Sequence, residues 1–244
     1  MHNMRHMAPP GYDAYVLVTP EQRPLLGNLD PARVRVIPNG VDLSRFTAPP
    51  PHAPARPFTV GRLSSLRPIK IPADWVRTAA GYGLLDTRFV IAGDGELRAA
   101  LEADVRALGL ESVFSLPGYV ARDDVPGLLA TFDVFCYVAS TAVECHPLAL
   151  IEAAAAGLPI VSEARGGIPG IVTHGLTGFL VDRPEEIGPC LHTLQRDVAL
   201  RRRMGLAARR SAERFSLDRQ IAAYDALLEA MSPWPQLVRP ASPS

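Results

Sequence analysis

The sequence has little cysteine, no excess of charge and no long apolar run, and each shortage excludes a class of protein. The three cysteines, Cys136, Cys145 and Cys190, are odd in number and far apart in a chain of 244 residues. This spacing argues against a disulfide framework and indicates a reducing compartment. Lys plus Arg and Asp plus Glu both number 25, giving a formal net charge of zero. A surface dedicated to nucleic acid is therefore not expected, although a local basic pocket is compatible with this balance.

The chain also lacks the hydrophobic segments that membranes and secretion require. No apolar run reaches the roughly 18 residues of a membrane-spanning helix, and the first residues contain no apolar segment typical of a signal peptide. The sequence therefore predicts a cytoplasmic protein and leaves peripheral association with a membrane open. Apolar residues still make up 48% of the chain, enough for a sizeable core.

Short apolar segments alternate with helical segments from Phe58 onward. This alternation predicts a parallel, doubly wound α/β sheet with helices on both faces. Strands are expected at residues 15–19, 33–37, 58–62, 88–92, 113–116, 133–138, 159–162 and 178–181. Helices are expected at residues 21–26, 71–80, 95–108, 123–130, 146–156, 168–172 and 185–231. In such sheets, ligands bind beyond the carboxyl ends of the strands.

Two carboxylates, Glu144 and Glu152, enclose seven residues around the expected start of one helix. Pro147 suits its first turn and Gly157 suits the left-handed cap after its last turn, which predicts a helix over 146–156. A helix N-terminus attracts anions through its unpaired N–H groups and its dipole. A diphosphate held there would bring an attached sugar near Glu144 and a ribose near Glu152. The alternative is that both glutamates are solvated positions on an ordinary amphipathic helix.

This block resembles the E-x7-E signature of retaining glycosyltransferases of the GT-B fold, family GT4. Three more segments resemble the same family: Ile37 to Phe46 ("IPNGVD…F"), Gly166 to Pro169 ("GGIP") and His174 to Gly178 ("GxTG"). The resemblance covers about residues 33–231 and implies the Rossmann-like, donor-binding lobe of a two-lobed enzyme. It implies transfer of a sugar from a nucleoside-diphosphate sugar to an acceptor hydroxyl with retention, as in cell-surface polysaccharide biosynthesis. It implies no cofactor and no metal.

The resemblance places two cations after the strand that ends in Gly61-Arg62-Leu63. A nucleoside diphosphate gains negative charge as it leaves, and a fixed pair of cations can offset that charge where no metal does. Arg62 matches the first cation. The second is either Lys70, which we favour, or Arg67, which fits the family's commonest spacing. With Glu144 at the donor sugar, Arg62 and Lys70 are the expected catalytic residues, and the alternative for either cation is a surface charge.

The other donor contacts come from the same resemblance. The "GxV" turn at Gly118-Tyr119-Val120 is expected near the nucleotide base, and Glu152 at the ribose. Adjacent Cys145 and His146 suggest a metal site or a nucleophile, but no further Cys or His lies at ligand spacing, so backbone contacts are favoured. The remaining expected donor-binding residues are Gly61, Ser140, His146, Leu148 and Ala149.

The two-lobed enzyme that the resemblance implies has an N-terminal acceptor lobe, and most of that lobe is expected to be missing from this sequence. Residues 1–47 are expected to hold a remnant of it and the interlobe segment, 48–57 a Pro-rich linker, 58–215 the nucleotide-sugar-binding domain, and 216–244 a closing helix and loose tail. The chain is then a fragment, or the acceptor lobe is a separate subunit, and the exposed apolar surface favours self-association or that subunit. The rival function is a non-catalytic nucleotide-sugar-binding module.

Overall fold

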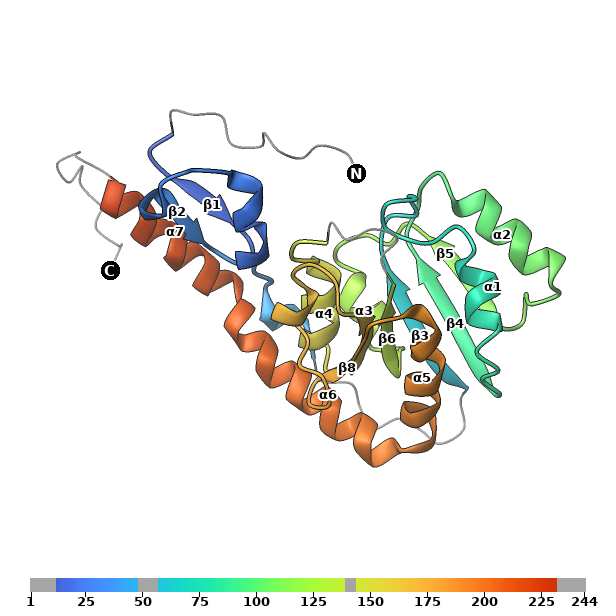
Figure 1. Ribbon diagram of the computed structural model, residues 1–244. Helices are drawn as coiled ribbons and strands as arrows, with labels where there is room; N and C mark the ends of the chain where they lie inside the picture. Colours follow the sequence, from blue (N-terminus) through green and yellow to red (C-terminus); the bar gives the residue numbers. More distant parts are fainter. Residues whose placement is uncertain (1–11, 48–56, 139–143, 232–244) are drawn as a thin grey trace.

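A six-stranded parallel sheet forms the centre of the computed structural model, which describes residues 12–47, 57–138 and 144–231 (Figure 1). The strand order is β5-β4-β3-β6-β7-β8, and every neighbouring pair is parallel. The strands are β3 (Phe58–Leu63), β4 (Thr87–Ala92), β5 (Phe114–Gly118), β6 (Val134–Tyr137), β7 (Ile160–Glu163) and β8 (Gly178–Val181). The predicted doubly wound α/β sheet is confirmed, with strand ends shifted by one or two residues.

Helices cover both faces of this sheet, because each strand alternates apolar side chains between two separate cores. One core joins the sheet to α1 (Trp75–Ala80), α2 (Arg98–Ala107) and α5 (Ile187–Arg196). The other joins it to α3 (Val125–Leu129) and α4 (Leu148–Ala155), with α6 (Val198–Ala212) packed on α4. In β6, Phe135 and Tyr137 belong to the second core, whereas Val134 and Cys136 belong to the first.

The strand order reverses between β3 and β6, which lie side by side although 70 residues separate Leu63 from Val134 in the sequence. The chain runs outward to β4 and β5 on one side, then returns to β6 and continues to β7 and β8. At such a reversal, the loops after the two central strands leave in opposite directions and open a crevice at their carboxyl ends. The carboxyl ends of β3 and β6, at Leu63 and Tyr137, therefore border the expected ligand-binding position.

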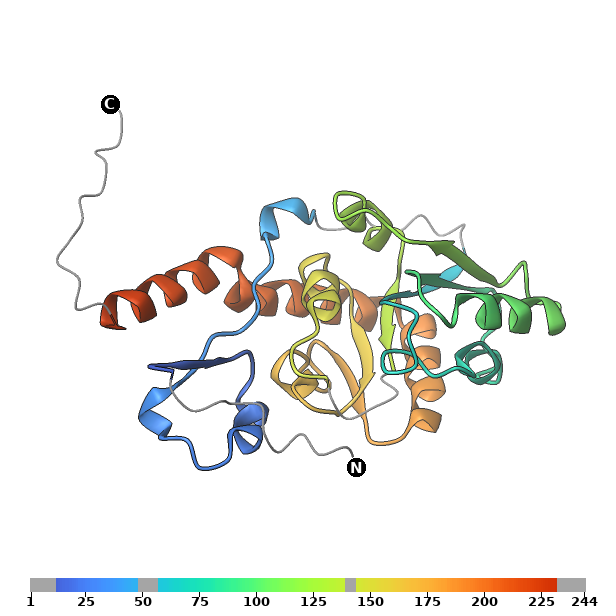
Figure 2. The same cartoon turned by 90° about the horizontal axis from the view of Figure 1, so that it is seen from above.

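A second, two-stranded parallel sheet lies apart from the main one and consists of β1 (Tyr15–Leu17) and β2 (Val34–Val36). The last helix, α7 (Leu217–Met231), extends beyond the main sheet towards this end of the molecule (Figures 1 and 2). None of its residues is buried, and it exposes the apolar side chains of Ile221, Tyr224, Leu228 and Met231. The expected exposed apolar surface is therefore present on α7.

The described residues also form short 3-10 helices. These are η1 (Pro20–Leu26), η2 (Pro31–Arg33), η3 (Leu43–Arg45), η4 (Ile168–Gly170), η5 (Pro184–Glu186) and η6 (Glu213–Phe215).

Several helices are shorter than the sequence predicted. The segment expected to be helical over 71–80 becomes an α-helix only at Trp75. The helix expected over 95–108 begins at Arg98, because Gly95 has a positive φ of 152° that no right-handed helix contains. The C-terminal 185–231 region contains three α-helices, and residues 48–56 of the expected linker lie outside the described residues.

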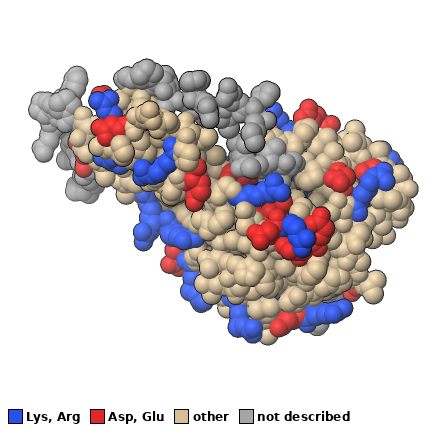
Figure 3. Space-filling model, in the orientation of Figure 1, with Lys and Arg blue, Asp and Glu red and all other residues tan. Residues whose placement is uncertain are grey.

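The surface carries both signs of charge. On the face shown in Figure 3, Lys and Arg side chains are interspersed with Asp and Glu side chains. Across the part of the chain that the structure describes, none of the helices has both the length and the apolar character that crossing a bilayer demands.

Candidate functional site

The fold brings Lys70, from the segment after β3, together with Glu144, from the segment after β6, although 73 residues separate them in the sequence. Lys70 Nζ lies 2.9 Å from Glu144 Oε1 and 3.0 Å from Oε2. The Glu144 side chain is 4% exposed and the Lys70 side chain 38% exposed. A buried carboxylate needs a compensating partner, and Lys70 supplies it while remaining open to solvent. Lys70 is the only lysine in the sequence.

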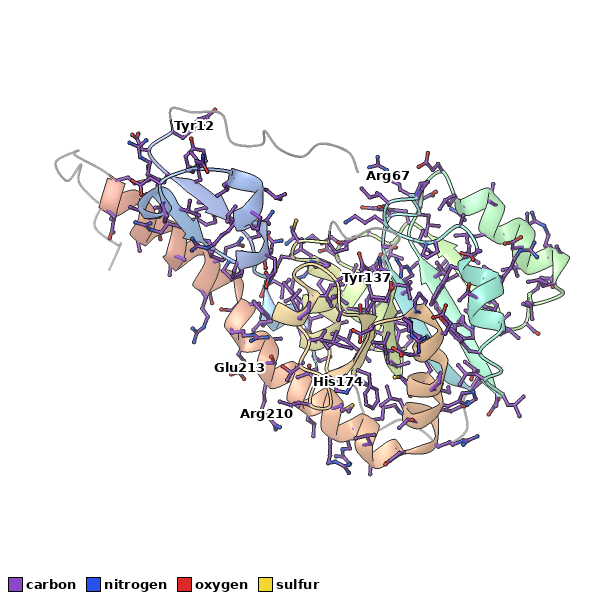
Figure 4. The ribbon with its side chains drawn as sticks, in the orientation of Figure 1. Tyr12, Arg67, Tyr137, His174, Arg210 and Glu213 are labelled. Atoms are coloured by element: carbon purple, nitrogen blue, oxygen red, sulfur yellow. The ribbon has the colours of Figure 1, made fainter. Side chains whose placement is uncertain are left out.

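Arg67, the alternative second cation, lies on the same loop but not at the site. Arg67 is exposed to solvent, and Figure 4 shows it at the outer side of the loop after β3. The two positions are linked by a turn in which Lys70 N donates to Arg67 O at 2.8 Å. This turn directs Lys70 back to Glu144. The structure thus brings Lys70, and not Arg67, to the predicted carboxylate.

Arg62 lies beneath the Lys70 loop and is 1% exposed. Its Nη2 donates to the main-chain oxygen of Lys70, and its Nε donates to Ser64 Oγ at 3.2 Å. Its Nη1 is buried and has no hydrogen-bond acceptor among the described residues. Burial lowers the pKa of Arg62, and the charge of Glu144 is among the influences that oppose this. Arg62 therefore fixes the backbone that carries Lys70 and adds positive charge behind it.

Tyr137 completes this group of side chains, and the sequence analysis did not identify it. It ends β6, is 2% exposed, and its ring centre lies 4.7 Å from Arg62 Cζ. Figure 4 shows it among the central side chains of the molecule. Burial raises the pKa of the Tyr137 hydroxyl, and so does the negative charge of Glu144, whereas the positive charge of Arg62 lowers it. An aromatic residue at the carboxyl end of a predicted strand was the only signal that could have indicated it.

The backbone of Glu144 is fixed by the "GGIP" loop. Gly167 N donates to Glu144 O at 2.8 Å, and a Cβ atom at position 167 would overlap the Cys145 carbonyl oxygen. Only glycine allows this approach of two backbones. The "GGIP" motif is therefore a packing device, and what it packs is the segment that carries Glu144.

The α4 helix begins two residues later than predicted, at Leu148. Pro147 is its N-cap, with φ of −65° and ψ of 119°, and does not belong to the first turn. Leu148 is 47% exposed and Ala149 is partly buried, so the first turn reaches solvent. Gly157, which follows the helix, has φ of 78°, in agreement with its predicted left-handed cap position. A helix start that is open to solvent beside Glu144 is a site where an anion can be stabilised.

Glu152 lies one helical turn inside α4 and is partly buried. Burial raises its pKa, whereas the positive charges of Arg122 and Arg45 lower it. Arg45 is held in place by hydrogen bonds to Arg122 O at 2.6 Å and Asp123 Oδ1 at 3.0 Å. Glu152 is therefore not an ordinary solvated surface residue of α4. These two arginines beside it were not found from the sequence.

His146 is buried and faces away from the start of α4. Its ring packs edge-on against Phe215 at 5.0 Å between centres, and its main-chain oxygen accepts from Asn39 Nδ2 at 2.9 Å. Nδ1 has no partner among the described residues. Burial lowers the pKa of His146 to about 4, helped by the charge of Arg214. His146 thus contacts the "IPNG" segment through its main-chain oxygen and η6 through its ring. Among residues 12–47, 57–138 and 144–231, no three His, Cys, Asp or Glu side chains are grouped to hold a metal.

We expect the stability of the fold to decrease as the pH falls from about 6.5 to about 4, partly through His146. The pKa of His146 is lower in the folded chain than the ordinary 6.5. Between these two pH values the unfolded chain therefore binds a proton that the folded chain does not, and lowering the pH favours the unfolded state. The contribution is roughly 3 kcal/mol at most. Urea denaturation of the wild type and of His146→Phe at about pH 7 and about pH 4.5 measures it. Equal pH dependence in both proteins would contradict this interpretation.

The remaining predicted residues lie at the same edge of the sheet or inside it. Gly61 lies within β3, where a Cβ atom would overlap the ring of Phe132. The absence of a side chain at Gly61 therefore allows Phe132 to pack against the strand. Gly118 ends β5, and the adjoining Tyr119 is 76% exposed while Val120 is partly buried. Ser140 lies outside the described residues.

Comparison with known proteins gives one family and a consistent group of relatives. The model of the family "Glycosyl transferases group 1" matches residues 61–211. A D-inositol 3-phosphate glycosyltransferase of Mycobacterium sp. (strain KMS) is 35% identical over 188 residues, covering 71% of this chain and 41% of that protein. The amylovoran biosynthesis glycosyltransferase AmsK of Erwinia amylovora is 31% identical over 133 residues, covering 53% of this chain and 32% of that protein. The chain thus spans less than half the length of these relatives.

Solved structures support the same fold. The crystal structure of Anabaena Alr3699/HepE in complex with UDP-glucose superimposes with a TM-score of 0.79 at 21% identity, covering 90% of this chain and 64% of that chain. At this identity the likeness establishes the architecture, that of a lobe of a GT-B glycosyltransferase. The interactions of Arg62, Lys70, Tyr137 and Glu144 are observations on this chain alone.

Proposed function

Because the chain belongs to the glycosyl transferases group 1 family, we propose that it binds a nucleoside-diphosphate sugar and provides the donor side of sugar transfer to an acceptor hydroxyl. The observation that carries the proposal is the convergence of Lys70 and Glu144 beside the start of α4, with Arg62 beneath them. Lys70 is the partly exposed cation that a diphosphate can reach. Glu144 is the carboxylate placed to accept from sugar hydroxyls.

The diphosphate is proposed to bind between Lys70 and the first turn of α4. Two sources of positive potential meet there: the Lys70 ammonium, with the Arg62 charge behind it, and the N–H groups of Leu148 and Ala149. These groups would offset the charge that the leaving diphosphate gains. We therefore propose binding without a divalent metal. UDP is the first nucleotide to test, since a structural neighbour is a complex with UDP-glucose.

The two carboxylates of the E-x7-E block are proposed to have separate ligands. Glu152, partly buried in α4 near Arg45 and Arg122, would accept hydrogen bonds from the ribose. Glu144 would accept from the sugar after Lys70 has turned to the diphosphate. Retention of the anomeric configuration, as in family GT4, and a role in cell-surface polysaccharide synthesis are part of this proposal. Relatives such as the amylovoran biosynthesis glycosyltransferase support the second point.

We expect Glu152→Ala to weaken the binding of a nucleoside diphosphate by about 1.5 to 3 kcal/mol, the range for hydrogen bonds to a charged group. Glu144→Gln is expected to leave nucleoside diphosphate binding nearly unchanged and to weaken binding of the complete sugar donor. Titration calorimetry in chelator with UDP and with UDP-sugars separates the two effects. Equal losses for both ligands in both variants would show that the carboxylates are assigned wrongly.

A second candidate is one subunit of a split glycosyltransferase, or a module that binds the sugar nucleotide without catalysing transfer. The exposed apolar residues Ile221, Leu228 and Met231 of α7 favour a protein partner over an isolated enzyme. Contiguous apolar surface of this kind is typical of interaction sites. The partner would be an acceptor lobe or a second copy of the chain. Transfer activity of the isolated chain separates this candidate from the first.

A further inference from the structure

A pocket of about 470 Å³ lies on the face of the sheet that α1 and α5 cover (Figure 1). Its wall comes from the segment 72–82 around α1, from Val138 directly after β6, and from Pro184 and Glu185 of η5. None of the lining residues is among the predicted donor contacts, and α4, whose start belongs to the proposed donor site, packs on the other face. A pocket of this volume suits a small organic molecule.

The pocket carries negative charge that the described residues leave unpaired. Asp74 and Glu185 line it and are exposed, and neither carboxylate has a hydrogen bond or ion pair among those residues. Arg77, which also lines the pocket, forms an ion pair of 2.5 Å with Asp104, so its charge is already balanced. The wall of the pocket is therefore acidic and favours a cation.

Aromatic rings and a hydroxyl form another part of the wall. The rings of Trp75 and Tyr82 pack edge to face, with 6.2 Å between their centres. The Tyr82 hydroxyl is buried and has no hydrogen-bond partner among the described residues. A buried hydroxyl without a partner is costly, and a donor on a ligand would supply the missing hydrogen bond. Aromatic faces beside carboxylates are the surroundings in which organic cations bind.

The pocket shares its wall with the segment that carries Lys70. Pro72 and Asp74, which line the pocket, follow Lys70 by two and four residues. The ring centre of Trp75 lies 5.9 Å from Arg62 Cζ. Arg62 in turn donates to the main-chain oxygen of Lys70. A ligand packed against Trp75 would therefore restrict the segment that presents Lys70.

We propose that the pocket lined by Asp74, Trp75, Tyr82 and Glu185, here called the α1 pocket, is a second binding site that takes a small organic amine. The ammonium group pairs with the two carboxylates and donates to the Tyr82 hydroxyl, and the apolar part packs against the aromatic rings. A bound amine restricts the Lys70 segment and so raises the affinity for a diphosphate. This last step rests on the proposed function, whereas binding of the amine does not.

The first measurement uses Trp75 as a reporter. The sequence contains one other tryptophan, Trp234, so the tryptophan fluorescence of a Trp234→Phe protein comes from Trp75 alone. We expect phenethylamine to change this fluorescence saturably. Its affinity is expected to be at least about tenfold higher than that of neutral 2-phenylethanol or anionic phenylacetate, since only the amine donates to charged acceptors. Equal affinities for the three compounds, or no saturable change, would overturn the proposal.

Variants of the wall locate the amine. Asp74→Asn combined with Glu185→Gln is expected to weaken phenethylamine binding at least about tenfold, and Tyr82→Phe about threefold. The matched control, Glu111→Gln combined with Glu229→Gln, removes two exposed carboxylates that do not line the pocket and is expected to leave the affinity unchanged. The Asp74 side chain makes no capping hydrogen bond, so its replacement preserves α1, and thermal melting verifies the fold of each variant. Equal affinities in the wall variants and the control would overturn the proposal.

The last measurement separates the α1 pocket from the proposed function. Calorimetry with UDP is expected to show about threefold tighter binding when phenethylamine is saturating, and the Asp74 and Glu185 double variant is expected to lose this effect. An unchanged affinity for UDP would overturn the link between the pocket and Lys70. If the chain binds phenethylamine and no nucleotide, the proposed function fails, and the fluorescence titrations still establish the amine site.

Discussion

Replacing Lys70 with alanine is expected to weaken nucleoside diphosphate binding about 100-fold, or roughly 3 kcal/mol, because the only cation that both reaches solvent and contacts Glu144 is lost from the described site. Arg67→Ala, three residues earlier on the same exposed loop, is expected to change the affinity less than about twofold, since screened surface charges contribute little. Calorimetry on the two variants under the same conditions measures the contrast.

The Lys70 variant needs a control for folding, because it leaves Glu144 buried without its cation. Removing one partner of a buried pair can cost roughly 3 to 5 kcal/mol, although the partial exposure of Lys70 allows water to reduce that cost. Lys70→Ala combined with Glu144→Gln removes the uncompensated charge. Compared with Lys70→Ala alone, this double variant is expected to be more stable, whereas its affinity for UDP is expected to remain low. If Arg67→Ala caused the larger loss of affinity, the second cation would be assigned to the wrong residue.

A polypeptide of these 244 residues is expected to bind donor and yet transfer sugar at least about 10⁵-fold more slowly than when an acceptor lobe is present. Holding the acceptor hydroxyl in line with the donor carbon is worth roughly 7 to 11 kcal/mol of barrier. Closing a second lobe over the site also excludes water that would hydrolyse the donor. Among the described residues, the structure has one six-stranded sheet and only the β1–β2 pair beyond it.

Transfer is measured with lipid, sugar and protein acceptors, with donor hydrolysis followed in parallel. Slow hydrolysis without transfer, by a protein that binds the donor, is the expected outcome. Sedimentation analysis establishes whether the active species is a monomer, since the exposed face of α7 favours association. Rapid transfer by a verified monomer would show that the groups supplied by a second lobe are not essential.

The main sheet could be predicted from the sequence because its strands are short, apolar and separated by helical segments of regular length. The predicted bounds of β8, residues 178–181, are the bounds that the structure shows, Gly178–Val181. Helix starts were less predictable, because their position depends on backbone geometry such as the conformation of Gly95 and Pro147. The spacing of apolar residues carries no information on these backbone conformations, so it cannot locate the first residue of a helix.

The site was predictable where a motif specified it and not where tertiary packing did. The sequence indicated Lys70 and Glu144, and the structure joins them. It did not indicate that Arg62 lies under the Lys70 backbone, nor that the Tyr137 ring lies against the Arg62 guanidinium. These contacts depend on β3 and β6 becoming neighbours, which follows from the sheet order and not from any local pattern. His146 likewise turned out to pack on Phe215, far along the sequence.

The most direct test of the central claim, that this crevice is a nucleotide-sugar donor site, is calorimetry of the purified chain with UDP, GDP and ADP in the presence of chelator. We expect saturable binding of at least one nucleotide without divalent metal, because Lys70, Arg62 and the start of α4 supply the positive potential. Loss of that binding in Lys70→Ala would assign it to this site. A chain that is shown to be folded and binds none of the three nucleotides would contradict the account.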